Sequence, residues 1–253
     1  MIISIEIFLV LLQKFLIMST KFGVVVFPGS NCDDDAVYVL SKKLNQKVVK
    51  LWHKQSDLEN CTHIILPGGF SYGDYLRSGA IARFSPIMNA VIDHAQKGGF
   101  VLGICNGFQI LCEAQLVPGV LLHNTNRKFI CKNVYITPSN YSTAITQHLP
   151  KNKKAFKIPI AHGEGNYYID NDGLKKLQDN DQIIFQYCDE NGLISESSNP
   201  NGSLLNIAGV CNKEKNVFGM MPHPERAADE ELRNTDGLYV FQSIIESALV
   251  NAF

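Results

Sequence analysis

The chain contains Phe100-Val101-Leu102-Gly103-Ile104-Cys105-Asn106-Gly107-Phe108, an apolar run that leads through a cysteine into a helix-like segment. At such a strand-to-helix turn, the side chain of a nucleophile projects away from the backbone. Gly103 and Gly107 flank the cysteine because a Cβ at either position would collide with the chain across the bend. At the N-terminus of the following helix, the dipole and the free N–H groups favour a thiolate. The segment therefore predicts that Cys105 is a nucleophile at the edge of a sheet.

The first half of the chain alternates short apolar runs with helical stretches. The expected strands span residues 24–27, 47–52, 63–66 and 100–104, and the expected helices span 33–44 and 85–97. Strands that are apolar throughout and alternate with helices indicate a parallel sheet with crossover helices.

The second half has a different pattern, in which few helices separate the strands. Strands are expected at 129–137, 155–161, 167–169, 183–188 and 207–211, followed by a last core strand at 217–221 and a closing helix at 237–253. We therefore predict a single α/β domain with a mostly parallel central sheet, flanking helices and an antiparallel extension on one side.

A second set of chemically suggestive residues follows the last core strand, in Met221-Pro222-His223-Pro224-Glu225. Ligands of open α/β sheets bind beyond the carboxyl ends of the strands, where this segment, Cys105 and the turn Pro67-Gly68-Gly69-Phe70 can meet. We expect Cys105 as nucleophile, His223 as base and Glu225 as the residue that orients the imidazole. The N–H of Asn106 and an N–H of the glycine turn are the expected oxyanion donors.

Composition excludes several classes of function. The formal net charge of -1 over 253 residues gives no basic field for nucleic acid or membranes. The seven cysteines include no Cys-x-x-Cys pair and no cluster with zinc-ligand spacing, so we expect reduced thiols, no metal and a cytoplasmic protein. We expect Cys112, Cys188 and Cys211 to pack in the core. No Gly-Lys-Ser/Thr follows the glycine turn, which argues against a nucleotide P-loop.

Residues 1–18 are apolar but interrupted by Glu6, Gln13 and Lys14. The segment is short for a membrane span and lacks the basic start and small-residue cleavage site of a signal peptide. We expect a dispensable extension that precedes a natural start at Met18, with residues 19–253 forming the domain. An amphipathic helix and a membrane anchor are the alternatives.

Together these motifs resemble the triad-type (class I) glutamine amidotransferase family. The family's elbow, Gly-x-Cys-x-Gly-x-Gln, is matched by Gly103, Cys105, Gly107 and Gln109, and its distal motif by His223-Pro224-Glu225. Within the family, the chain is most similar to glutaminase subunits of phosphoribosylformylglycinamidine synthase, an enzyme of purine biosynthesis. Four segments carry this similarity, which runs from about Phe22 to the C-terminus: Gly23–Asp33, Leu66–Arg77, Pro159–Gly165 and Gly219–Arg226. Residues 1–18 have no counterpart.

The resemblance implies a flavodoxin-like architecture and a division of labour between subunits. This chain would hydrolyse glutamine to glutamate and ammonia without a cofactor of its own. A large synthetase subunit would use ATP and magnesium to activate formylglycinamide ribonucleotide, and a small subunit would bridge the two. Ammonia would pass between the active sites, and neither nucleic acid nor a membrane is an implied partner.

The resemblance also implies site residues beyond the triad. Gly69 and Phe70 would line the amide site, and Gln109 would lie beside the elbow. Asn126, Arg127 and Phe129 would contact the backbone of the glutamine. For His162-Gly163-Glu164-Gly165 we expect an interface or loop-shaping role, because the triad is already complete without it.

Two other functions compete with this interpretation. A cysteine hydrolase or peptidase built on the same elbow would act alone on γ-glutamyl or peptide bonds, but it gives no role to Ser71–Arg77 or to His162–Gly165. A non-catalytic scaffold would have lost part of its site, whereas all three expected triad residues are present.

Overall fold

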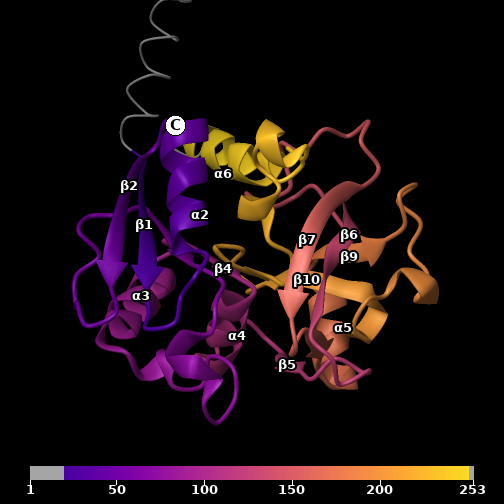
Figure 1. Cartoon of the computed structure of the whole chain (residues 1–253), viewed down its shortest axis with the longest axis horizontal. Coiled ribbons are helices and arrows are strands. Elements are labelled where there is room, and N and C mark those ends of the chain that lie inside the picture. The colour runs from indigo at the N-terminus through magenta and orange to yellow at the C-terminus, as the bar shows by residue number, and fades with distance from the viewer. Residues whose placement is uncertain (1–19, 251–253) are drawn as a thin grey trace, which may run out of the picture.

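A computed structural model describes residues 20–250 and contains one large mixed sheet (Figure 1). Its nine strands follow the order β2-β1-β3-β4-β11-β10-β9-β6-β7. The first five strands in that order are mutually parallel, and each of the remaining four is antiparallel to its neighbour. The predicted α/β class, with a parallel centre and an antiparallel extension, is therefore confirmed.

The parallel half contains the strands that lead into the predicted site. Its strands are β1 (Lys21–Val26), β2 (Lys47–Trp52), β3 (His63–Leu66), β4 (Phe100–Ile104) and β11 (Val217–Met220). Its helices are α2 (Asp33–Tyr38), which continues as a wider π-helical turn to Lys43, α3 (Pro86–Gln96) and α4 (Asn106–Glu113). Helix α4 packs on β3, β4 and β11, which fixes the residue before it, Cys105, at the carboxyl edge of the sheet.

The antiparallel half lies on the right in Figure 1. It contains β6 (Ile130–Pro138), β7 (Phe156–His162), β9 (Ile183–Cys188) and β10 (Ile207–Cys211), with α5 (Asn171–Asp179) beside them. β5 (Val120–Leu122) and β8 (Asn166–Tyr168) form a separate two-stranded sheet, and α6 (Leu238–Val250) ends the described chain.

The far end of the sheet curls back toward its centre. β7 is the last strand in the order, yet the His223 N–H donates to the Pro159 carbonyl of β7 at 2.9 Å. The Cys105 thiol likewise donates to the Ala161 carbonyl, with 3.6 Å between sulfur and oxygen. β7 runs in the same direction as β4 and β11, so its carboxyl end lies against the sheet edge that carries Cys105 and His223.

Several elements differ from the sequence prediction. The expected helix over 33–44 changes to a π-helical turn at Val39, and the expected strand at 167–169 pairs with β5 instead of joining the main sheet. Helix α5 was not predicted, because Leu174 and Leu177 are the only large apolar residues in a polar segment. The closing helix is described to Val250, and the expected extension 1–18 lies outside the described residues.

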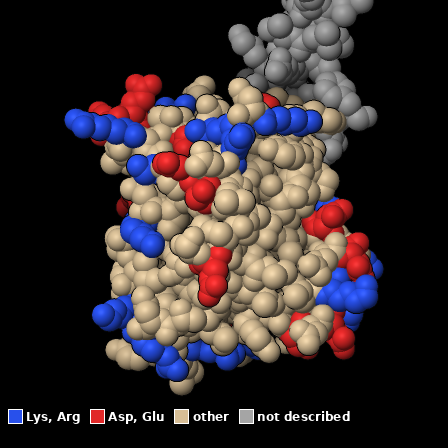
Figure 2. All heavy atoms as spheres, turned by 90° about the vertical axis from the view of Figure 1, so that its right-hand side faces the viewer, with Lys and Arg blue, Asp and Glu red and all other residues tan. Residues whose placement is uncertain are grey.

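The distribution of surface charge and the state of the cysteines agree with what the composition predicts. On the face shown in Figure 2, basic and acidic side chains lie in scattered, mixed groups, and neither sign covers the face. All seven cysteines lie in the described part and are free, and Cys112, Cys188 and Cys211 are buried as predicted. Between residues 20 and 250, none of the helices has the length and apolar character needed to cross a membrane.

Candidate active site

Cys105 occupies a sharp turn between β4 and α4. Its backbone has φ +50° and ψ -105°, a combination that side chains other than glycine rarely adopt, and its N–H is fixed to the Met220 carbonyl of β11 at 2.8 Å. Such backbone strain is maintained only where the surrounding structure imposes it, and it concentrates at functional sites. The predicted elbow geometry is present.

Gly107 provides the close approach that the elbow requires. A Cβ at this position would overlap the Leu66 carbonyl at the end of β3, and backbone atoms there have little room to move. We expect Gly107→Ala to lower the free energy of unfolding by about 3 kcal/mol, measured by urea denaturation.

Gly163→Ala is the matched control for this substitution. A Cβ at Gly163 would meet only the Phe129 ring, at 3.9 Å, so its stability should stay close to that of the wild type. Equal stabilities for the two variants would mean that the elbow tolerates a side chain.

His223 and Glu225 form a buried pair at the carboxyl end of β11. The His223 Nδ1 to Glu225 Oε1 distance is 2.6 Å, and the side chains are 2% and 0% exposed. A short 3-10 turn, η6 (Pro224–Arg226), places the carboxylate below the ring. This bond leaves Nε2 as the ring nitrogen available for proton transfer. Nε2 is buried and has no hydrogen-bond partner among the described residues.

The environment of His223 stabilises the charged imidazolium. Burial lowers the pKa of His223, but the Glu225 carboxylate and the Cys105 and Cys32 thiols outweigh it and raise this pKa well above its ordinary value. An imidazolium beside a cysteine nucleophile is the form that can protonate a leaving amine.

Cys32 is a neighbour of this pair that sequence reasoning missed. Its Sγ lies within 4.8 Å of a His223 ring nitrogen and of a Glu225 carboxylate oxygen, and its N–H donates to the Gly68 carbonyl at 3.3 Å. Its position after β1, at the same edge of the sheet, is the signal that was available. Cysteine, histidine and glutamate side chains can together bind Zn²⁺. Here, however, His223 Nδ1 is already hydrogen-bonded to Glu225, and this arrangement fits a triad better than a metal site.

Two backbone N–H groups near Cys105 are free to act as donors. Neither Asn106 nor Gly69 has a hydrogen-bond partner for its N–H within the described chain, whereas the Phe70 N–H donates to the Gly29 carbonyl. Gly69 has φ +142°, and a Cβ there would lie 2.8 Å from the Asn31 nitrogen. The glycine turn is thus kept open toward the elbow by backbone packing.

A cavity of about 180 Å³ opens beside the Cys105 thiol. The predicted residues that line it are Gly69, Phe70, Cys105, Gln109 and Phe129. Residues that sequence reasoning did not assign to the site also line it, and they include Asp74, Ser78, His123, Ala161, His162 and Glu164. Four of these residues belong to the family motifs Leu66–Arg77 and Pro159–Gly165, namely Asp74, Ala161, His162 and Glu164. The motifs were recognised, but no place in the cavity was predicted for these side chains.

A hydrogen-bonded network joins the first turn of α4 to both walls of the cavity. Asn106 accepts from the Ser71 N–H at 3.1 Å and donates to the Gln109 side chain at 2.9 Å. Gln109 in turn donates to the Glu164 carbonyl at 2.7 Å. Asn106 and Gln109 are both buried, so the network orders the loops around the nucleophile.

Asn126 and Arg127 lie outside this cavity. Both are exposed, and the turn closes on itself because the Lys128 N–H donates to Asn126 and the Arg127 N–H to the Asn124 carbonyl. Phe129 does reach the cavity, where its ring lies 6.3 Å from that of Phe70. The structure therefore brings one of these three predicted contacts to the site.

His162 shapes the loop that follows β7. Its Nδ1 pairs with Asn124 Oδ1 at 3.0 Å, and the same oxygen accepts from the Gly165 N–H at 3.2 Å. Burial and the charge of His223 lower the pKa of His162 to about 4, so its imidazole is neutral at physiological pH. These contacts fit the expected loop-shaping role better than that of a second base.

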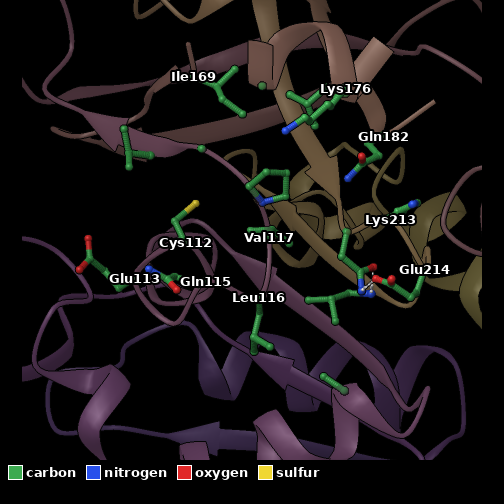
Figure 3. A pocket seen from close by; sticks show the side chains of 18 of the residues that line it. Cys112, Glu113, Gln115, Leu116, Val117, Ile169, Lys176, Gln182, Lys213 and Glu214 are labelled. Atoms are coloured by element: carbon green, nitrogen blue, oxygen red, sulfur yellow. Dashed lines mark hydrogen bonds between the residues drawn. The ribbon is translucent and has the colours of Figure 1, made fainter. Parts of the chain in front are cut away.

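A larger cavity, of about 900 Å³, lies elsewhere (Figure 3). It is lined by Cys112 and Glu113, at the opposite end of α4 from Cys105, and by Lys176, Gln182 and Lys213. Cys112 comes seven positions after Cys105, which corresponds to about 10 Å along the helix axis. Burial raises the pKa of Cys112, which further disfavours it as a nucleophile. The smaller cavity is thus the candidate active site.

Comparison with known proteins supports this choice. The model of a CobB/CobQ-like glutamine amidotransferase domain matches residues 19–237. The chain belongs to the glutamine amidotransferase family. Phosphoribosylformylglycinamidine synthase subunit PurQ of Koribacter versatilis is 54% identical over 225 residues, which cover 89% of this chain and 97% of that protein. The PurQ subunit of Chlorobium chlorochromatii is also 54% identical, over 89% and 96% of the two chains.

A solved structure gives the same family. A chain of the PurLQS structure from Thermotoga maritima is 42% identical, with a TM-score of 0.77, and the match covers 90% of this chain and 98% of that one. These findings confirm the predicted PurQ-type family, fold class and enzyme class. This chain is a glutaminase-type subunit of purine biosynthesis.

Proposed function

We propose that Cys105, His223 and Glu225 are the triad that hydrolyses glutamine, with the cavity of about 180 Å³ as the glutamine site. The observation that carries this proposal is the buried His223–Glu225 pair at 2.6 Å, on the same sheet edge as a strained cysteine that opens into that cavity. Gly69, Phe70, Gln109 and Phe129 line the cavity.

The first half of the reaction forms a thioester. The thiol proton of Cys105 passes to His223 as the sulfur attacks the side-chain amide carbon of glutamine, and the N–H groups of Asn106 and Gly69 stabilise the oxyanion. His223 donates its proton to the amide nitrogen, so the C–N bond breaks and ammonia leaves. Glu225 holds the imidazole in position and stabilises its charge.

The second half releases glutamate. Water attacks the thioester carbon, and His223 accepts the proton of that water. The C–S bond then breaks, and Cys105 and His223 return to their starting state. One glutamine and one water thus give one glutamate and one ammonia.

The ammonia supplies a second active site on a partner. We propose that a large PurL-type synthetase subunit uses ATP and magnesium to convert formylglycinamide ribonucleotide to formylglycinamidine ribonucleotide, and that a small PurS-type subunit bridges the two. Similarity to a chain of PurLQS supports this assembly. Because free ammonia is mostly protonated in neutral water, direct transfer keeps it nucleophilic. A free-thiol nucleophile favours a reducing compartment, so we propose the cytoplasm.

The test is ammonia release from glutamine by the chain alone and with the synthetase subunits, ADP and magnesium. We expect slow turnover alone and strong activation in the complex, because the partners order the loops around the site. Fast turnover that ignores the partners would favour an independent hydrolase, and cleavage of peptides but not glutamine would favour a peptidase. No turnover in either state would favour a scaffold.

A further inference from the structure

Two carboxylates line the proposed glutamine cavity together with the nucleophile. Asp74 comes from the loop between β3 and α3, and Glu164 from the loop between β7 and β8. The Ser78 N–H donates to Glu164 Oε2 at 3.4 Å, and Asn106 Nδ2 donates to Asp74 Oδ1 at 3.4 Å. Different elements of the fold thus hold both acids at one cavity, and the Asn106–Gln109 network links them to the elbow.

These carboxylates have little positive charge to balance them. No lysine or arginine lines the cavity. The nearby Arg77 is paired with Glu113 at 2.7 Å, and the one ion pair of Glu164 is with the exposed His123, at 3.6 Å. Burial, together with the charge of Glu164, raises the pKa of Asp74 to about 6, although hydrogen bonds from Ser78 and Asn106 oppose this.

A bound cation would compensate this excess of negative charge. Glutamine has no net charge, but it carries a cationic group, the α-ammonium, at the other end of the side chain from the amide that Cys105 attacks, and this group can compensate the carboxylates locally. The oxyanion donors and the thiol would hold the amide end of the substrate, so its amino-acid end must contact other residues that line the cavity, among which Asp74 and Glu164 are the acids.

We propose that Asp74 and Glu164 bind the α-ammonium group and so select L-glutamine over amides that lack it. This inference rests on the proposed glutaminase function. Both residues are specificity-determining contacts to the substrate and take no part in bond making or breaking. Charge-assisted hydrogen bonds of this kind are stronger than neutral ones, and their loss weakens binding more than it slows chemistry.

The test compares Asp74→Asn and Glu164→Gln with the wild type, in the complex if the chain alone is slow. We expect each variant to raise KM for L-glutamine roughly 10- to 100-fold with little change in kcat. Glutaramate, the same amide without the amino group, should be a poor substrate or inhibitor of the wild type and should be affected less than threefold by either variant. Asp93→Asn is the control, because Asp93 pairs only with Lys97 on the surface.

Labelling of Cys105 provides a readout that does not depend on turnover. A chloromethyl ketone analogue of glutamine, which carries the α-ammonium, should inactivate both variants roughly 10-fold or more slowly than the wild type. Iodoacetamide, which lacks that group, should alkylate all of them at equal rates.

The pH dependence adds a further check. Asp74 takes up a proton as the pH falls through about 6, so KM for L-glutamine should rise below that pH in the wild type, and this rise should be absent from Asp74→Asn. The other titratable groups that line the cavity are Glu164, His123, His162 and Cys105. Glu164→Gln should keep the limb that Asp74 produces but move it to lower pH, because the charge of Glu164 helps to raise the pKa of Asp74.

Equal losses with L-glutamine and glutaramate, or slower reaction with iodoacetamide, would overturn the inference in favour of a structural role. Unchanged KM in both variants would also overturn it. If the wild-type complex releases no ammonia from L-glutamine, the proposed function itself fails, and this inference fails with it.

Discussion

Cys105→Ala should lower ammonia release from glutamine by at least about 10⁴-fold, because Cys105 is the cysteine that lines the cavity and forms the thioester. Alanine is smaller than cysteine and so fits the site without a clash, and it loses the hydrogen bond from the thiol to the Ala161 carbonyl. The measurement is glutamate formation by the complex under saturating glutamine. Synthesis driven by added ammonium chloride should continue at the wild-type rate, because free ammonia bypasses the glutamine site.

Cys131→Ala is the matched control, because Cys131 is the exposed cysteine of the seven. It should retain full activity with both nitrogen sources. Loss of ammonia-driven synthesis in Cys105→Ala would mean that the residue supports the assembly, and residual glutaminase activity near the wild-type level would remove Cys105 from the mechanism.

Much of the sheet could be predicted because its strands are short and mostly apolar runs. β2, β3, β4, β9 and β10 have the predicted bounds, and each ends at a turn residue or a change in polarity. The elements that were missed bury few side chains. Helix α5 has one buried residue, Leu177, and β5 is only three residues long, so local patterns carry little information about them.

The proximity of the proposed triad residues could be predicted for a related reason. Cys105 directly follows β4, and His223 comes three positions after the end of β11. The two strands are parallel neighbours, which brings both residues to one edge of the sheet. The walls of the cavity depend on long-range geometry instead. Glu164 reaches the site because the antiparallel extension curls back, and no sequence periodicity encodes that curvature.

The unusual backbone conformation of the loop that contains Asp74 could not be predicted either. Tyr72, Asp74 and Leu76 all have positive φ, at +55°, +53° and +71°, although none is glycine. Turn rules assign such angles to glycine or asparagine, so they predict nothing specific for this loop. The direction of the Asp74 carboxylate therefore emerges only from the folded structure.

Glu225→Gln should lower kcat/KM for glutamine by roughly 10² to 10⁴-fold with little change in stability or shape. The amide has the size of the carboxylate but no charge, and it can hold His223 in the wrong tautomer by donating to Nδ1. The buried position leaves no water to replace the lost charge, since the Glu225 side chain is 0% exposed. The measurement is the pH profile of kcat/KM between pH 5 and about 10, as bell-shaped profiles report the essential acid and base.

The direction of the pH effect follows from the causes of the His223 shift. Burial lowers the pKa of His223, while Glu225, Cys105 and Cys32 raise it, and the net result lies well above the ordinary value. Removing the Glu225 charge leaves burial opposed by fewer groups, so the pKa falls and the imidazolium is lost at a lower pH. The alkaline limb of the profile should therefore move to lower pH in Glu225→Gln. In the exposed control Glu230→Gln it should not move. An unshifted limb with a large loss of rate would assign Glu225 to positioning alone, whereas wild-type kinetics would remove it from the triad.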